Sequence, residues 1–305
     1  MASDAADPHG PALPAAPGRR PPGPLSSPVQ VDVAGLSHPG HVRPNNEDHF
    51  LVLRFGRFLE PLATNLPAGQ APPRCEDVGY AVAVADGMGG HAAGEEASRL
   101  ALTTLVGLVL GTPDWFLRMG DPPSAEEVMR RAAERFGRID QALAEEAVED
   151  PTLHGLGTTM TLAASLGWDL LLAHVGDSRA YLFRGGALHQ LTRDHTLVCE
   201  LYEAGMVDSA QAAAHHLRHF LTRHLGASKG ARPDVKRLAL ADGDCLLLCT
   251  DGLSDMVSDA EIADMLVGGG PSEAMSQRLV DRALAAGGKD NVTVVVAQYR
   301  APAGR

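Results

Sequence analysis

An apolar run leads into an aspartate and a glycine-rich turn in Val82-Ala83-Val84-Ala85-Asp86-Gly87-Met88-Gly89-Gly90. The valine-rich run predicts a buried β-strand that fixes the carboxylate of Asp86 at its end. The glycines after it let backbone groups come close to whatever that carboxylate holds. In a second interpretation, Asp86 caps a helix that begins near Gly90. Both interpretations predict a strand followed by a turn.

The same arrangement of aspartate and strand recurs along the chain. Asp251 follows the apolar run Leu246–Cys249, Asp290 precedes the run Val292–Val296, and Asp177 lies in a turn between two apolar runs. Carboxylates next to buried strands are costly to desolvate unless a cation pairs with them. Too few lysines and arginines lie nearby in the sequence to pair with all of them. Hard divalent cations, Mg²⁺ or Mn²⁺, are the alternative partners, because they prefer ligand sets made only of oxygen atoms.

The order of apolar and amphipathic segments predicts an α+β fold with antiparallel sheets rather than a regular βαβ alternation. Tight spacing of the second, third and fourth apolar runs predicts adjacent antiparallel strands. The expected strands are Tyr80–Ala85, Thr158–Leu166, Leu170–Val175, Ala180–Phe183, Cys245–Cys249 and Val292–Tyr299. The expected helices cover about Gly94–Leu110, Ser124–Val148, Ser258–Val267 and Ser272–Ala286, and the second and third open with capping boxes.

Composition narrows the class of protein. The chain has 305 residues, 45% of them hydrophobic, and a formal net charge of -12, which argues against a nucleic-acid binder. Four scattered cysteines fit a reducing compartment better than a zinc site or a disulfide framework. We find no signal peptide and no apolar stretch long enough to span a membrane. We therefore expect a cytoplasmic protein without a membrane partner.

Two segments are too rich in proline to form regular structure. Residues 1–28 are rich in Pro, Ala and Gly and predict a disordered tail, because they cannot bury enough apolar surface to offset their ordering entropy. Residues 60–77 predict a long loop between two strands. Everything between the first tail and a short C-terminal tail at 301–305 is expected to form one domain, residues 29–300.

Six short motifs, taken in order, resemble one family. They are Arg43 with Glu47-Asp48, Asp86-Gly87-Met88-Gly89-Gly90, Gly157-Thr158-Thr159, Gly176-Asp177-Ser178-Arg179, Thr250-Asp251-Gly252 and Asp290-Asn291. Together they resemble the bacterial metal-dependent Ser/Thr protein phosphatases of the type 2C class, the PPM family, over about Val31 to Tyr299. The resemblance implies a β-sandwich of two antiparallel sheets flanked by α-helices on both sides, a four-layer αββα architecture.

The resemblance also implies a ligand set for two or three Mn²⁺ or Mg²⁺ ions. Asp86 would bridge two of them, and the carbonyl of Gly87 would complete the coordination of one. Asp251 and Asp290 would hold the second ion. Asp177, together with Asp251, would hold a weaker third ion.

Three further residues receive roles from the resemblance. Glu47 and Asp48 would lie beside the waters of the first ion, and Arg43 would bind the substrate phosphate. An arginine suits this role because it takes phosphate oxygens bidentately, although a surface salt bridge from Arg43 to Glu47 or Asp48 is the plainer alternative. Met88 stands where eukaryotic members carry a histidine, so the group that protonates the leaving oxygen is not assigned.

The implied activity is the hydrolysis of phosphoserine and phosphothreonine by direct attack of a water activated by a two-metal centre. The implied partners are phosphorylated proteins, including Ser/Thr kinases, and we expect a monomer. A non-catalytic phosphopeptide-binding relative is the alternative from another class, but such proteins usually lose a metal aspartate. A third hypothesis is a sporulation- or stress-type phosphatase acting on a small regulatory domain that carries one phosphoserine.

Relatives carry a mobile flap over the site, which here would span about His195 to Leu225. Four histidines lie within it: His215, His216, His219 and His224. They could form a metal-binding cluster, but a solvated helix face is the plainer interpretation. A flexible lid of this kind is a candidate for substrate selection.

Overall fold

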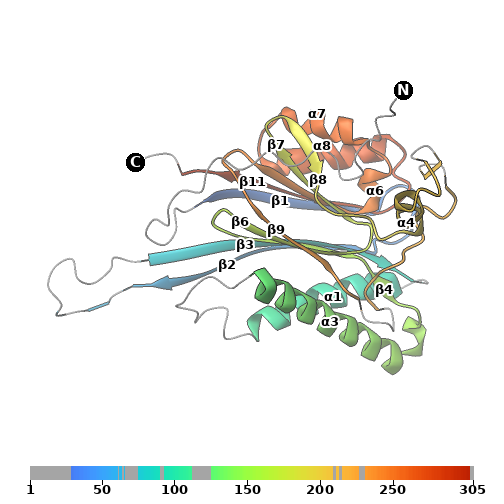
Figure 1. Ribbon diagram of the computed structural model, residues 1–305, viewed down its shortest axis with the longest axis horizontal. Helices are drawn as coiled ribbons and strands as arrows, with labels where there is room; N and C mark the ends of the chain where they lie inside the picture. The colour runs from blue at the N-terminus through green and yellow to red at the C-terminus, as the bar shows by residue number, and fades with distance from the viewer. Residues whose placement is uncertain are drawn as a thin grey trace.

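The computed structural model describes residues 29–60, 62–63, 65, 75–89, 93–111, 125–208, 211–212, 215–226 and 231–302. Two antiparallel sheets are stacked face to face, and helices cover the outer face of each (Figure 1). This is the four-layer sandwich that the sequence predicts. The predicted disordered tail, residues 1–28, lies outside the described residues.

One sheet has the order β1 (Gln30–His38), β11 (Val292–Arg300), β10 (Cys245–Cys249), β7 (Arg179–Arg184) and β8 (Ala187–Gln190). The other has the order β2 (Asp48–Leu59), β3 (Cys75–Met88), β5 (Met160–Leu166), β6 (Asp169–Val175) and β9 (Asp234–Ala239), and β4 (Gly157–Thr158) pairs with the end of β3. Every pairing is antiparallel.

The helices fall into two groups. The group over the second sheet is α1 (Ala93–Leu110) and α3 (Ala125–Glu149), followed by the short η1 (Pro151–Leu153). The group over the first sheet is α6 (Asp251–Ser254), α7 (Asp259–Val267) and α8 (Ser272–Ala285), whereas α4 (Leu197–Glu203) lies at one end of the sandwich (Figure 1). The predicted capping box at the start of α7 is present, with reciprocal bonds between Ser258 and Glu261. The one predicted at Ser124 lies outside the described residues.

The expected pairing of three successive strands is only half right. β5 and β6 form an antiparallel pair, but β7 belongs to the other sheet. The chain changes sheets at Gly176, whose φ of 113° lies in a region that other residues rarely adopt. The turn that carries Asp177 is therefore a crossing between sheets, and not a hairpin.

Alternation along the strands divides the apolar residues among three cores. On β3, Val82 and Val84 face the other sheet, whereas Ala83 and Ala85 face the helices. The core between the sheets also contains Tyr299 of β11, whose hydroxyl lies 3.3 Å from Ser165 Oγ of the other sheet. A third core joins α7 and α8 to the first sheet.

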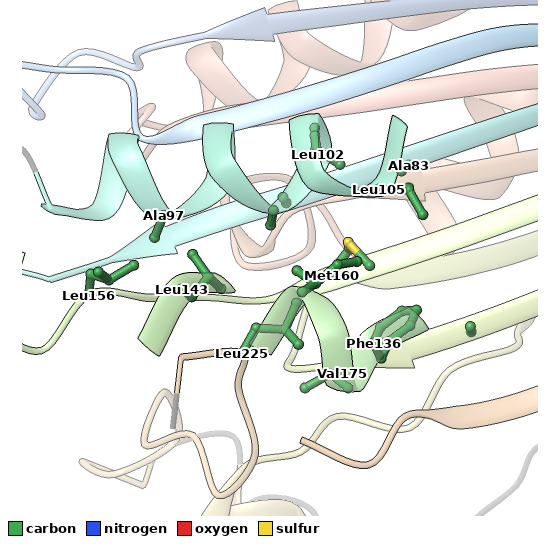
Figure 2. Packing of buried hydrophobic residues seen from close by; sticks show 14 of the residues in the cluster. Ala83, Ala97, Leu102, Leu105, Phe136, Leu143, Leu156, Met160, Val175 and Leu225 are labelled. Atoms are coloured by element: carbon green, nitrogen blue, oxygen red, sulfur yellow. The ribbon is translucent and has the colours of Figure 1, made fainter. Parts of the chain in front are cut away.

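The core under α1 and α3 uses small residues where elements approach closely. Ala97 of α1 packs toward the sheet that carries Ala83, and both side chains are fully buried (Figure 2). Larger side chains such as Phe136 and Leu143 of α3 fill the space farther from the sheet (Figure 2). Burying one side chain of that size stabilises the fold by about 1.5–3 kcal/mol.

Antiparallel pairing brings the aspartates of the motifs to one end of the sandwich. Asp48 at the start of β2 pairs directly with Asp86 near the end of β3. β10 runs antiparallel to β11, so Asp251 after the first strand and Asp290 before the second lie at the same edge. The fold thus gathers carboxylates that are far apart in the sequence.

Two smaller observations bear on expectations from the sequence. Cys199, Cys245 and Cys249 are free thiols, and the latter two are buried in or beside β10 as small apolar residues. Among the described residues, no helix combines the length and the apolar character that crossing a membrane requires.

We predict that a buried ion pair remote from the aspartate edge stabilises the first sheet. Arg184 donates to both carboxylate oxygens of Asp244 at 2.8 and 2.6 Å, and the Asp244 side chain is 1% exposed. Asp244→Ala should lower the free energy of unfolding by about 3 kcal/mol, because it leaves a buried guanidinium without its carboxylate. Urea denaturation measures this. Asp264→Ala, at an exposed position on α7, is the control and should change stability by less than about 0.5 kcal/mol. Equal effects would contradict the prediction.

Candidate active site

A hollow of about 240 Å³ opens at the edge where the strand ends meet. Seven of the eight residues that the sequence singles out line it: Arg43, Glu47, Asp86, Gly87, Asp177, Asp251 and Asp290. The eighth, Asp48, lies beneath the surface of the hollow beside Asp86 and is 4% exposed. The structure therefore brings the whole predicted set together in one cleft, which we call the carboxylate cleft.

Asp48 is the most deeply buried carboxylate of the group. Its Oδ2 accepts a hydrogen bond of 2.8 Å from the hydroxyl of Thr250, but its Oδ1 has no hydrogen-bond partner among the described residues. Burial raises the pKa of Asp48 to about 7, and the charges of Asp251 and Asp290 add to this effect. An oxygen left in this state is suited to accept a bond from a metal-bound water or a similar donor.

At Asp86, too, burial and neighbouring negative charges disfavour the ionised carboxylate. Its pKa is raised well above the ordinary value, first by burial and then by the charge of Asp48, with Asp251 and Asp177 contributing. Burial is also the main cause of the raised pKa values of Asp177 and Glu47. These carboxylates thus destabilise one another wherever all are ionised.

Each Asp-Gly turn needs its glycine because a backbone carbonyl lies against it. A Cβ at Gly87 would come within 1.9 Å of the carbonyl oxygen of Gly94 at the start of α1. A Cβ at Gly252 would come within 1.9 Å of the carbonyl oxygen of Asn291. Close backbone approach of this kind is available only to glycine. It locks the first turn to α1 and the second to the start of β11.

Asn291 fixes the loop that carries the arginine. Its Nδ2 donates to the carbonyl oxygens of Pro39 and Asn45 at 2.9 and 2.8 Å, and its Oδ1 accepts from the amide of Glu47 at 2.8 Å. These bonds tie residues 39–47 to β11, so they place Arg43 at the rim of the cleft. The sequence motif contained Asn291, but its role in positioning this loop depends on the tertiary structure.

Arg43 forms an ion pair, although not with the partners considered from the sequence. Its Nη2 lies 2.6 Å from Asp290 Oδ2 rather than against Glu47 or Asp48. The hydrogen bond to Asp290 is the main cause of its raised pKa. The side chain is 54% exposed, so the guanidinium faces the opening of the cleft.

His219 lines the cleft, whereas the sequence indicated only that it lies in the flap. Its Nδ1 lies 3.6 Å from Asp251 Oδ2, and its Nε2 lies 3.2 Å from Asp255 Oδ2. The interaction of its imidazole with the Asp251 carboxylate is the main cause of the raised pKa of His219. The predicted helix face is wrong, because residue 215 has no regular structure and residues 216–219 form a turn. The rings of His215 and His216 stack with their centroids 4.8 Å apart, and among the described residues only His219 of the four belongs to a group of possible metal ligands, together with Asp177 and Asp251.

The donor set of the cleft suits hard divalent cations. Five of its described lining residues carry carboxylates, and Arg43 is the single arginine or lysine among the lining residues that the structure describes. Buried carboxylates that lack compensating charge are strongly unfavourable, and bound cations would remove that cost. His91, which lies close to Met88 in the sequence, is outside the described residues. Met88 lines the cleft and offers no titratable group.

Comparison with known proteins identifies the class. A family model described as protein phosphatase 2C matches residues 74–289. Protein phosphatase PhpP of Streptococcus pneumoniae is 34% identical over 87% of this chain and 96% of its own length. Serine/threonine protein phosphatase PstP of Mycobacterium tuberculosis is 40% identical over 81% of this chain and 45% of its own length. The solved catalytic domain of PstP in complex with two manganese ions superposes with a TM-score of 0.69 and 34% identity, covering 90% of this chain and all of that one.

The sandwich and its acidic cleft are therefore those of a metal-dependent phosphatase. The chain belongs to the protein phosphatase 2C family, as both the family model and the relatives show. It is a bacterial-type serine/threonine protein phosphatase, a hydrolase that acts on phosphoproteins.

The burial of Asp48 predicts an unusual pH dependence for the metal-free protein. The folded state holds a proton on Asp48 up to about pH 7, whereas the unfolded chain releases it near the ordinary value of 3.8. The stabilisation that results from this pKa difference is complete below about pH 3.8 and is lost as the pH rises to about 7. The metal-free protein should therefore be less stable at about pH 7.5 than at about pH 5, as urea unfolding in the presence of a chelator can show.

Asp48→Asn should reduce this dependence, because the amide stays neutral and its oxygen can still accept a hydrogen bond from the Thr250 hydroxyl, whereas the raised pKa values of Asp86, Asp177 and Glu47 maintain the remainder. Asp264→Asn is the matched control, an exposed position on α7 that should leave the dependence intact. An unchanged pH dependence in Asp48→Asn would contradict the assignment.

Proposed function

We propose that the carboxylate cleft holds the catalytic cations through Asp86, the carbonyl of Gly87, Asp251 and Asp290. The convergence of these groups on one hollow, with too little positive charge to balance them, carries the proposal. The two manganese ions in the solved PstP catalytic domain support it. We infer that the ions are Mn²⁺ or Mg²⁺, since both prefer oxygen ligands.

The chain's own residues divide the work on a phosphorylated serine or threonine. Bound cations would supply Lewis acidity toward a water and the phosphoryl oxygens. Glu47 and Asp48 would accept hydrogen bonds from waters of the first ion, and the unsatisfied Oδ1 of Asp48 supports this role. Arg43 binds the phosphate at the mouth of the cleft, and its pairing with Asp290 orients the guanidinium.

Asp177 has a separate role in the proposal. It faces the cleft from the crossing between β6 and β7, and with Asp251 it would hold a weaker third cation. Loss of Asp177 should modulate the rate without removing the two main ions.

The physiological setting is inferred at one remove. The substrates are phosphorylated proteins, and we propose Ser/Thr kinases among them, because such a phosphatase reverses their modifications. A monomer located in the cytoplasm remains our prediction from the sequence, as does the absence of nucleic-acid binding, which the net charge of -12 supports.

We predict that turnover depends on the cleft aspartates and on metal. With Mn²⁺ the protein should hydrolyse p-nitrophenyl phosphate and a phosphothreonine peptide, and a chelator should abolish both activities. Asp86→Asn and Asp251→Asn should each lower kcat/KM by at least about a hundredfold. Asp281→Asn, at an exposed position on α8, is the matched control and should retain full activity. Full activity in chelator, or in either cleft variant, would refute the proposed centre.

We also predict that Arg43 acts through its planar, forked guanidinium and not through charge alone. Arg43→Lys keeps the charge but loses bidentate hydrogen bonding, so kcat/KM for a phosphopeptide should fall about tenfold, equivalent to about 1.4 kcal/mol. Steady-state kinetics at saturating Mn²⁺ measures the change. Arg54→Lys on β2 is the control. If Arg43→Lys matched the wild type, phosphate binding would have to be assigned elsewhere.

A further inference from the structure

The flap segment that carries His219 is tied to the cleft by backbone hydrogen bonds. The amide of Leu197 donates to the carbonyl of Phe220 at 2.9 Å, and the amide of Thr222 donates to the carbonyl of His195 at 2.8 Å. An isolated bridge between Thr196 and Leu221 lies between these two bonds. His219 therefore sits directly before an anchored stretch, which fixes where its imidazole can reach.

The root of this segment is also bonded to the turn that carries Asp177. The amide of His195 donates to the carbonyl of Gly176 at 2.7 Å, and the amide of Gly176 donates to Nδ1 of His195 at 3.1 Å. With Nδ1 as the acceptor, Nε2 carries the hydrogen and donates to Asp234 Oδ2 at 3.1 Å. The flap and the Asp177 turn thus form one hydrogen-bonded unit.

Three possible metal ligands meet where the flap reaches the cleft. One ligand atom each from Asp177, His219 and Asp251 lies within 4.8 Å of the other two. Ligands at about 2.1 Å from one cation lie roughly 3 to 4.2 Å apart, so small side-chain shifts would close the set around an ion. The three residues come from a sheet crossing, the flap and the start of α6.

Asp177 gives an independent reason to expect an ion at this point. Its side chain is 9% exposed and receives no hydrogen bond from another side chain in the part of the chain that the structure describes. Two arginines that line a neighbouring hollow together with Asp177 are directed to other carboxylates: Arg179 bonds Asp194 at 2.7 Å, and Arg218 lies 3.3 Å from Asp255. A buried carboxylate without a side-chain partner is costly, and a cation between it and Asp251 would remove that cost.

We propose that His219 is a flap-borne ligand of the cation held by Asp177 and Asp251, so that binding of this ion fixes the flap against the cleft. The proposal rests on the proposed function, because it takes a cation at these two aspartates as given. An imidazole ligand also makes this site chemically different from the all-oxygen centre beside it. It should favour Mn²⁺ or Co²⁺ over Mg²⁺, since imidazole suits transition metals better.

The decisive test compares three variants by two measurements that do not use activity. His219→Ala removes the proposed ligand. Asp255→Asn keeps His219 but removes the carboxylate that lies 3.2 Å from His219 Nε2 and 3.3 Å from Arg218. His216→Ala changes an exposed histidine of the same segment and is the matched control. The measurements are Mn²⁺ stoichiometry by equilibrium dialysis and amide hydrogen exchange of residues 215–222 with and without Mn²⁺.

Wild-type protein and His216→Ala should bind one more Mn²⁺ than His219→Ala, or bind the weakest ion at least about tenfold more tightly. Mn²⁺ should slow exchange of the flap in both proteins and in Asp255→Asn, but not in His219→Ala. Mg²⁺ at the same concentration should slow it less.

Two outcomes would overturn the proposal. One is equal Mn²⁺ binding by His219→Ala and the wild type. The other is that, without metal, amide exchange of the flap speeds up equally in His219→Ala and Asp255→Asn, and that Mn²⁺ slows it in neither variant. That result would assign His219 to the ion pair with Asp255 alone. Failure of the proposed function looks different, because the wild type would then bind no Mn²⁺ at all.

Discussion

Mutual repulsion among buried carboxylates is the constraint on which the rest of this structure depends. Asp48 and Asp86 face each other across a β-ladder, and Asp251 adds its charge from the other sheet. A cluster of this kind does not stabilise the fold, since each ionised carboxylate raises the pKa of its neighbours. Three largely aliphatic cores stabilise the sandwich enough to hold these carboxylates together. Their clustered negative charge in turn favours the binding of cations.

The sandwich meets this constraint by rigid means. Antiparallel pairing sets which strand ends share an edge, and the two Asp-Gly turns then fix the carboxylates by pressing a glycine against a carbonyl of Gly94 or Asn291. Three hydrogen bonds of Asn291 hold the loop that carries Arg43 against the start of β11. Arg43 and the aspartates are thereby placed by one network and not by separate loops, as preorganised catalysis requires.

Local signals made most of the cleft predictable from the sequence, and the misses were all questions of tertiary structure. Asp86 and Asp251 are recognisable in the sequence because each follows an apolar run and precedes a glycine. The edge strand β9 has only two partly buried residues, Val235 and Leu238, among exposed ones and contains no apolar run, so nothing marked it as a strand. The change of sheet at Gly176 depends on a backbone conformation that spacing alone does not reveal. The position of His219 follows from the bridge between Thr196 and Leu221, which joins residues 25 positions apart.

The division between strands and flap separates two properties of the enzyme. The carboxylates at the strand ends cannot shift without disturbing a sheet, so the core holds their positions constant. His219 lines both the carboxylate cleft and a neighbouring hollow of about 340 Å³, which Asp255, Arg218 and Cys199 also line. A change in the flap at His219 therefore reshapes both hollows while the carboxylates at the strand ends stay in place. Substrate preference can therefore vary through the flap independently of catalysis, which is how loops on a rigid scaffold usually diversify function.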